Sequence, residues 1–229
     1  RRSLQFFDAT GEAVHKVHLR PASNLYAYQK LISQLESANQ DAALDVLPRS
    51  VGGAAETADA PVDAAALRER WSKLTDIHQF FGMLRTLKLD RRQAVRLVGA
   101  DYAWKLDNSA VGSMLHLAAA DALPIMCFVG NRGCIQIHSG PITNIKPMGP
   151  WINVLDETFH LHLRLDHIEE IWVVRKPTKD GHVTSIEAYG ADGETIIQFF
   201  GQRHEGESER EDWRFLAENL PRIPGLAAV

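Results

Sequence analysis

Hydrophobic positions recur with different periods along the first half of the chain. Residues 3–7 and 13–20 alternate in part between apolar and polar side chains, which predicts two strands around a turn at Gly11. Residues 24–35 instead carry apolar side chains at helical spacing, with Asn24 placed to cap the helix. Helical spacing returns after residue 62 and predicts four further helices, which begin at Asp63, at Thr75 or Asp76, at Asp90 and at Ser109.

Pro124 ends the helical pattern, and from there to residue 201 the spacing is typical of strands. Strands are predicted at residues 125–129, 134–139, 151–155, 159–165, 168–175, 183–189 and 195–200. Short turns rich in Gly, Asp and Asn separate them, which favours an antiparallel arrangement. Residues 159–165 alternate most regularly, so one face of that strand should be packed and the other wet. With a last helix at residues 209–220, the pattern predicts an α+β fold: a large antiparallel β-sheet meander with helices packed on one side.

Residues 37–62 separate these two parts and are predicted to form a flexible linker. The segment is rich in Ala, Asp and Gly and contains no aromatic side chain. Such a composition buries too little apolar surface to offset the entropy lost on ordering.

A short internal repeat bears on the domain organisation. Leu4–Phe7 reads LQFF and residues 197–200 read IQFF, and an amphipathic helix follows each copy. The repeat predicts that residues 1–36 are the tail of an N-terminal repeat half and residues 63–229 the C-terminal half, with about 120 upstream residues absent from the chain. Residues 3–20 would then need a new strand partner, and a dimer through these strands is one expected outcome. The alternative is that the first strands extend the edge of a single sheet.

Composition and charge narrow the class of protein. The 229 residues are 45% hydrophobic and 24% charged, which is ordinary for a globular chain. The net charge of −4 argues against nucleic-acid binding, and no apolar stretch is long enough to span a membrane. Two cysteines are too few for a disulfide scaffold and fit a reducing, cytoplasmic setting.

Few residues suggest chemistry by themselves. His78 lies among aromatic and aliphatic residues at helical spacing, where an imidazole is a suitable axial ligand for heme iron. From the local sequence alone, however, a partly buried histidine with a structural role is the better explanation. His160 and His162 share one strand face, but no third metal ligand stands at a recognisable spacing. Motifs of hydrolases, kinases and nucleotide-binding proteins are missing from the sequence. Three cations at predicted element ends are suited to binding carboxylates, although ordinary surface charge explains any single one of them better: Arg91, Lys176 and Arg203.

Several longer stretches together resemble the bacterial haemin-degrading or heme-transport factor family, the HemS-like cytoplasmic heme-binding proteins. They are residues 76–84 (DIHQFFGML), 106–111 (LDNSAV), 123–141 (LPIMCFVGNRGCIQIHSGP), 149–156 (GPWINVLD) and 198–203 (QFFGQR). The likeness covers nearly the whole chain apart from the linker.

The resemblance implies two tandem halves, each with helices on a large antiparallel sheet, and heme (iron protoporphyrin IX) in a cleft of the C-terminal half. It implies that His78 is the axial ligand of the iron and that Arg91, Lys176 and Arg203 hold the propionates. It also implies that residues upstream of this chain approach the other side of the heme, so the isolated chain is expected to lack that distal wall.

Two function classes stay open. One is heme binding and trafficking in bacterial iron acquisition, between an inner-membrane heme ABC importer and a heme oxygenase. The other is a heme-degrading enzyme that opens the macrocycle and releases iron. The cofactor carries the reactive iron in both, so residue types do not separate them.

Overall fold

The computed structural model describes residues 2–41, 45–48, 63–204 and 206–223. These residues form two compact units: residues 1–52 with 131–134, and the remainder of the chain. Most of the predicted linker, residues 37–62, lies outside the described residues. None of the helices in the described ranges has the length and apolar character needed to cross a bilayer.

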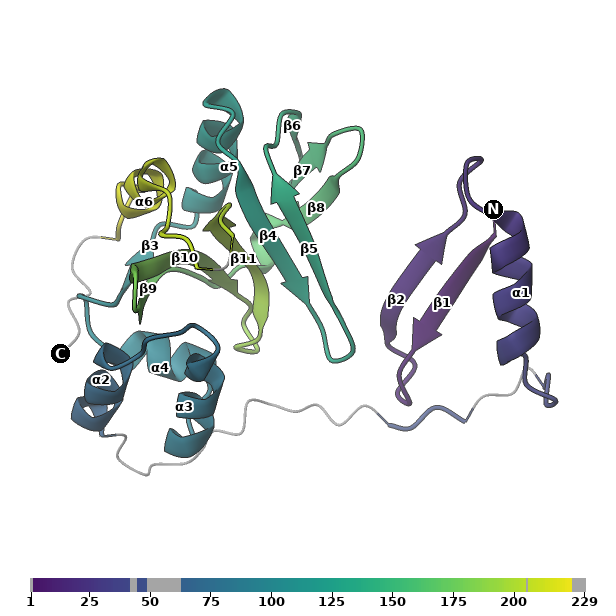
Figure 1. Cartoon of the computed structure of the whole chain (residues 1–229), viewed down its shortest axis with the longest axis horizontal. Coiled ribbons are helices and arrows are strands. Elements are labelled where there is room, and N and C mark those ends of the chain that lie inside the picture. The colour runs from purple at the N-terminus through teal and green to yellow at the C-terminus, as the bar shows by residue number, and fades with distance from the viewer. Residues whose placement is uncertain (1, 42–44, 49–62, 205, 224–229) are drawn as a thin grey trace. The chain divides into compact units, whose positions relative to one another are not determined.

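The first unit is a hairpin followed by a helix (Figure 1). Strands β1 (Ser3–Phe7) and β2 (Ala13–His18) pair only with each other, in antiparallel register. Helix α1 (Leu25–Leu35) starts where expected, because the Asn24 side chain accepts a hydrogen bond from the backbone N–H of Ala27 at 2.9 Å. The alternative in which these strands extend the edge of the large sheet is therefore wrong.

The second unit contains a six-stranded antiparallel sheet in the order β3-β9-β10-β11-β4-β5. Its strands are β3 (Ala103–Leu106), β4 (Ile125–Gly130), β5 (Ile135–Gly140), β9 (Glu170–Thr178), β10 (Gly181–Tyr189) and β11 (Thr195–Gly201). A separate three-stranded sheet is made by β6 (Ile145–Met148), β7 (Trp151–Leu155) and β8 (His160–Arg164), followed by a short 3-10 turn at Leu165–His167. The α+β class is confirmed, but the single continuous meander is wrong, because the chain turns into the second sheet after β5 and returns only at β9.

Helices cover both faces of the six-stranded sheet, so the prediction of helices on one side is wrong (Figure 1). One core cluster packs α5 (Ala110–Ala120) and α6 (Glu211–Glu218) against Ile171 and Val173 of β9. The other packs α2 (Ala64–Ser72), α3 (Gln79–Leu87) and α4 (Arg91–Leu97) against Trp172 and Val174. Successive strand residues point to opposite faces, so this unbroken apolar run is buried on both sides.

Two strands were not predicted from the sequence. β3 is only four residues long, and a five-residue connection joins it to α4. β6 contains Pro147, which is tolerated because β6 is an edge strand of the small sheet. In β8 the predicted alternation is confirmed: Leu161 and Leu163 are buried, whereas His160 and His162 are exposed.

Candidate functional site

A buried cluster of charged side chains lies where α4 meets β9 and β10. The carboxylate of Glu187 is fully buried. The Arg91 guanidinium binds it with two parallel hydrogen bonds of 2.7 Å, from Nε to Oε2 and from Nη2 to Oε1. Lys176, only 3% exposed, donates from Nζ to Oε1 at 2.6 Å. Two of the three cations proposed from the sequence therefore meet on one carboxylate.

Two hydroxyl groups complete the shell around this carboxylate. Ser185 Oγ donates to Glu187 Oε1 at 2.7 Å, and Tyr189 Oη donates to Oε2 at 2.5 Å. Ser185, Glu187 and Tyr189 alternate along β10, so all three side chains point to the same face of the sheet. The cluster holds two cations and one anion, and thus carries an excess positive charge in a buried place.

The pKa values of the cluster reflect this imbalance. Burial, opposed by the charge of Glu187 and aided by that of Arg91, lowers the pKa of Lys176 to about 8. Burial alone would raise the pKa of Glu187, but the charges of Arg91 and Lys176 hold it well below its ordinary value. At neutral pH the cluster is therefore Arg⁺, Lys⁺ and Glu⁻.

Aromatic rings lie next to the two cations. The Phe80 ring centroid of α3 is 5.1 Å from both Arg91 Cζ and Lys176 Nζ. The Phe200 ring of β11 is 5.9 Å from Lys176 Nζ and packs edge-on against Phe128 of β4 at 5.1 Å. We call Arg91, Lys176 and Glu187, with the rings of Phe80 and Phe200, the cationic site.

An apolar strip extends from the cationic site across the same face of the sheet. Glu187 pairs across strands with Gln198, Gln198 with Phe128, and Phe128 with Ile137. Ile137 is 54% exposed, and Phe81 on α3 is 66% exposed. Gln198 Nε2 is buried and, within the described part of the chain, has no hydrogen-bond partner. This face therefore offers apolar contact surface and one unused buried donor beside the excess positive charge.

His78 lies at the start of α3, and the prediction that it stands inside the helix is wrong. The helix begins at Gln79, because the Asp76 carboxylate accepts the backbone N–H of His78 at 2.7 Å and holds the preceding residues in a turn. The same oxygen, Asp76 Oδ1, lies 2.7 Å from His78 Nδ1, while 79% of the imidazole is exposed. A carboxylate on Nδ1 fixes that nitrogen as the donor and leaves the lone pair of Nε2 free, which is the usual arrangement of a metal-binding histidine.

Arg203 lies outside the buried cluster of Arg91, Lys176 and Glu187. Its Nη1 donates to the backbone carbonyl of Glu207 at 3.2 Å. Hydrogen bonds from His78 lower the pKa of Asp76, and the charge of Arg203 adds a smaller effect in the same direction. The charge of Arg203 thus acts weakly on Asp76, whereas Arg91 and Lys176 contact Phe80, two residues after His78 in sequence.

The other histidines do not build a metal site. His162 Nδ1 lies 2.7 Å from the side-chain oxygen of Asn153, and His160 is a neighbour on the same strand. Among the residues that the structure describes, no group of three His, Cys, Asp or Glu side chains is arranged to hold a metal ion.

Sequence reasoning missed the residue at the centre of the site. Ser185 and Glu187 stand at alternating positions within the buried part of β10, and both were read only as strand residues. Polar side chains at alternating positions of a two-sided buried strand are the signal that could have found them.

Comparison with known proteins adds a family to this geometry. The sequence profile described as the Haemin-degrading HemS.ChuX domain matches residues 1–35 and 88–220. The matched ranges include Arg91, Lys176 and Arg203, while His78 falls in the gap between them.

Individual relatives agree with this match. The chain is 44% identical to the hemin transport protein HmuS of Yersinia pestis over 97% of its own length and 63% of the relative. A crystal structure of holo-PhuS, a heme-binding protein from Pseudomonas aeruginosa, superimposes with a TM-score of 0.91 at 49% identity, over 96% of this chain and 64% of that one. ChuS, described as an E. coli heme oxygenase, superimposes with a TM-score of 0.81 at 40% identity, over 95% and 64% of the two chains. The chain thus spans a little under two thirds of the length of these relatives.

Proposed function

We propose that this chain, which belongs to the family of haemin-degrading HemS/ChuX-domain proteins, binds heme at the cationic site. Its proposed role is heme trafficking in bacterial iron acquisition. The observation that carries this proposal is the buried excess positive charge of Arg91 and Lys176 over Glu187, next to an apolar sheet face. Heme is complementary to such a site, because it is a flat apolar macrocycle with two carboxylates on one edge.

The excess charge supports a carboxylate ligand on energetic grounds. A buried charge without a counterion is unfavourable, and an anion that reaches Lys176 relieves that penalty. A charge-assisted hydrogen bond of this kind contributes about 1.5–3 kcal/mol. Arg203 is proposed to hold the second carboxylate.

His78 is proposed as the axial ligand of the heme iron through Nε2. The Asp76 carboxylate orients the imidazole and keeps the proton on Nδ1. When bound, heme supplies the redox-active iron, and the protein supplies binding, orientation and the electrostatic environment. The work of this chain is then to present one neutral imidazole and at least two cations to the same ligand.

A heme titration of the 229-residue chain tests this assignment. His78→Ala should weaken binding and shift the Soret maximum, whereas His160→Ala and His162→Ala, on exposed positions of β8, should leave both unchanged. A wild-type spectrum in the His78 variant would overturn the axial-ligand assignment.

Heme degradation is the second candidate, favoured by the 40% identity to a protein described as a heme oxygenase. The two candidates differ in one measurement, the Soret band of the heme complex with a reductant, oxygen and catalase present. Loss of the band supports degradation, and an intact band supports a carrier. We favour the carrier.

We further propose that the two compact units belong to two repeat halves, with residues 1–36 as the tail of the first half and residues 63–229 as the C-terminal half. The separate hairpin of β1 and β2 and the greater length of the relatives support this. The proposed setting is the cytoplasm, with an inner-membrane heme importer and a heme oxygenase as donor and acceptor. If residues of a first repeat half supply the distal wall, a protein that contains both halves should bind heme more tightly than the 229-residue chain.

A further inference from the structure

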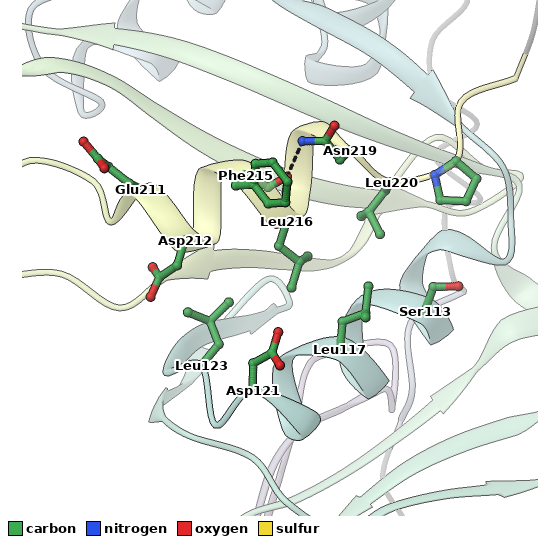
Figure 2. A pocket seen from close by; sticks show the side chains of 11 residues that line it. Ser113, Leu117, Asp121, Leu123, Glu211, Asp212, Phe215, Leu216, Asn219 and Leu220 are labelled. Atoms are coloured by element: carbon green, nitrogen blue, oxygen red, sulfur yellow. Dashed lines mark hydrogen bonds between the residues drawn. The ribbon is translucent and has the colours of Figure 1, made fainter.

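A groove of about 730 Å³ lies between α5 and α6, on the opposite side of the six-stranded sheet from α3 (Figure 2). Two stripes at helical spacing face it. Ser113, Leu117 and Asp121 stand on α5 and at its end, four residues apart. Asp212, Leu216 and Leu220 repeat the same spacing on α6 and just after it. Figure 2 shows the helices antiparallel, with Asp212 near Asp121 and Leu220 towards Ser113.

Two apolar side chains that line the groove, Leu117 and Phe215, lie outside the core of the domain, whereas Leu123 and Leu220 belong to it. The inner faces of the two helices are already buried through Met114, Leu115, Trp213 and Ala217. Phe215 is nevertheless 73% exposed and Leu117 is 48% exposed on the outer side. Two neighbouring exposed apolar side chains, flanking a hollow, are typical of a surface that a partner covers.

The charge of the groove is uneven along its length. Asp121, Glu211 and Asp212 gather at one end, where the C-terminus of α5 and the N-terminus of α6 lie. Arg210 pairs with Asp212 at 2.5 Å, but neither Asp121 nor Glu211 forms an ion pair within the described ranges. The other end, with Ser113, Asn219 and Pro221, is uncharged, and Asn219 is turned back to the carbonyl of Phe215 at 2.8 Å.

We infer that this groove docks a short amphipathic helix of a partner protein, with Leu-type side chains on one face and Lys or Arg at one end. Amphipathic helices commonly bind with their apolar face in a hydrophobic groove of this kind. At 1.5 Å per residue, the 11 residues of α5 and 8 of α6 offer a length of about 12–16 Å, or two to three helical turns. The carboxylates match a cationic partner and oppose an anionic one, so heme itself does not fit this groove.

The test uses the 229-residue chain and two labelled peptides of about 16 residues. One is an amphipathic helix of Leu, Ala and Lys, with its lysines at one end; the other has Glu in place of Lys. Fluorescence anisotropy should show saturable binding of the Lys peptide and at least tenfold weaker binding of the Glu peptide. Phe215→Ser should weaken the Lys peptide about tenfold or more, since exposed aromatic anchors dominate such interfaces.

Charge reversal and matched controls complete the experiment. Asp121→Lys with Glu211→Lys should weaken the Lys peptide and improve the Glu peptide. Leu97→Ser, at an apolar position of α4 that is 38% exposed, should change neither. Equal binding of the two peptides, or binding that the groove variants leave unchanged, would overturn the proposal. Self-association of the chain in sedimentation that Phe215→Ser abolishes would also overturn it, because the groove would then join two copies of this chain. Lys176→Met should leave peptide binding intact, so this outcome is separate from that of the heme proposal.

Discussion

Replacing Lys176 by methionine separates a ligand-binding role from a structural one. Lys176 donates to Glu187 at 2.6 Å and to Ser185 at 3.1 Å, but Glu187 also keeps two hydrogen bonds from Arg91 and two from hydroxyl groups. Removing the lysine therefore leaves the carboxylate paired with Arg91 and removes the excess positive charge of the cluster.

The magnitudes follow from that difference. Because a charge-assisted contact contributes about 1.5–3 kcal/mol, Lys176→Met should weaken heme binding roughly tenfold to a hundredfold. The free energy of unfolding of the heme-free protein should change by less than about 1 kcal/mol or increase, because well-packed apolar replacements of buried ions are often neutral or stabilising.

The assays are a heme titration and urea unfolding of the heme-free chain. Lys105→Met is the matched control, since Lys105 also lies beside a carboxylate, Glu170 at 3.5 Å, that an arginine, Arg96, pairs as well. This control should leave heme affinity unchanged. A loss of about 3–5 kcal/mol of stability in Lys176→Met, with heme affinity unaltered, would refute the reasoning and make Lys176 a structural partner of Glu187.

Four further predictions follow from the same geometry. Glu187→Gln removes the anion that pairs with both buried cations and should lower the free energy of unfolding by about 3–5 kcal/mol in urea; a loss below about 1 kcal/mol would contradict the pairing. The pKa of Lys176, about 8, is depressed relative to an unfolded lysine, so the folded chain binds fewer protons above pH 8. The free energy of unfolding should therefore rise with pH between about 8 and 10.5, and heme affinity should fall over the same range. Lys176→Met should lack both effects, so parallel pH profiles of the wild-type chain and the variant would argue against titration of Lys176. Asp76→Asn should shift the Soret maximum and weaken heme binding about tenfold or more while leaving Lys176 effects unchanged, as checked by titration; an unaltered spectrum would show that Asp76 does not orient a ligand. Gly201→Ala should lower stability by about 1–3 kcal/mol in thermal or urea unfolding, because the new Cβ would lie 2.6 Å from Trp213 Cβ; unchanged stability would mean that α6 shifts freely.

Local elements were predictable from the sequence where one physical signal dominated. Asn24 and Asp63 cap the helices that they were predicted to cap, through hydrogen bonds to Ala27 and Ala66. The clean alternation of residues 159–165 likewise predicted which side of β8 is buried. In each case a short stretch contains the whole cause, either a cap or a two-residue period.

The arrangement of the sheets was not predictable from these local signals. Periodicity does not say that the chain leaves the large sheet after β5 and returns at β9, since that depends on pairing between residues far apart in sequence. The helix start at Gln79 was missed for a different reason: Asp76 and His78 form a side-chain-stabilised turn before the helix, and residue spacing does not separate such a turn from the first turn of a helix.

The candidate site shows the same division. Arg91 and Lys176 were found as cations suited to carboxylates, but nothing local revealed that they share Glu187. These contacts bring together the start of a helix and two neighbouring strands, and Arg91 and Glu187 are 96 positions apart in sequence. A buried charge excess is a property of the assembled fold, and only the structure could display it.

The most direct test of the central claim compares heme with its dimethyl ester, in which both carboxylates are blocked, on the wild-type chain and on Lys176→Met. If the cationic site binds a heme carboxylate, esterification should weaken binding to the wild-type chain about tenfold or more and have much less effect on the variant. Equal losses on esterification in the two proteins would contradict the claim, because Lys176 would then contribute nothing that depends on the carboxylate.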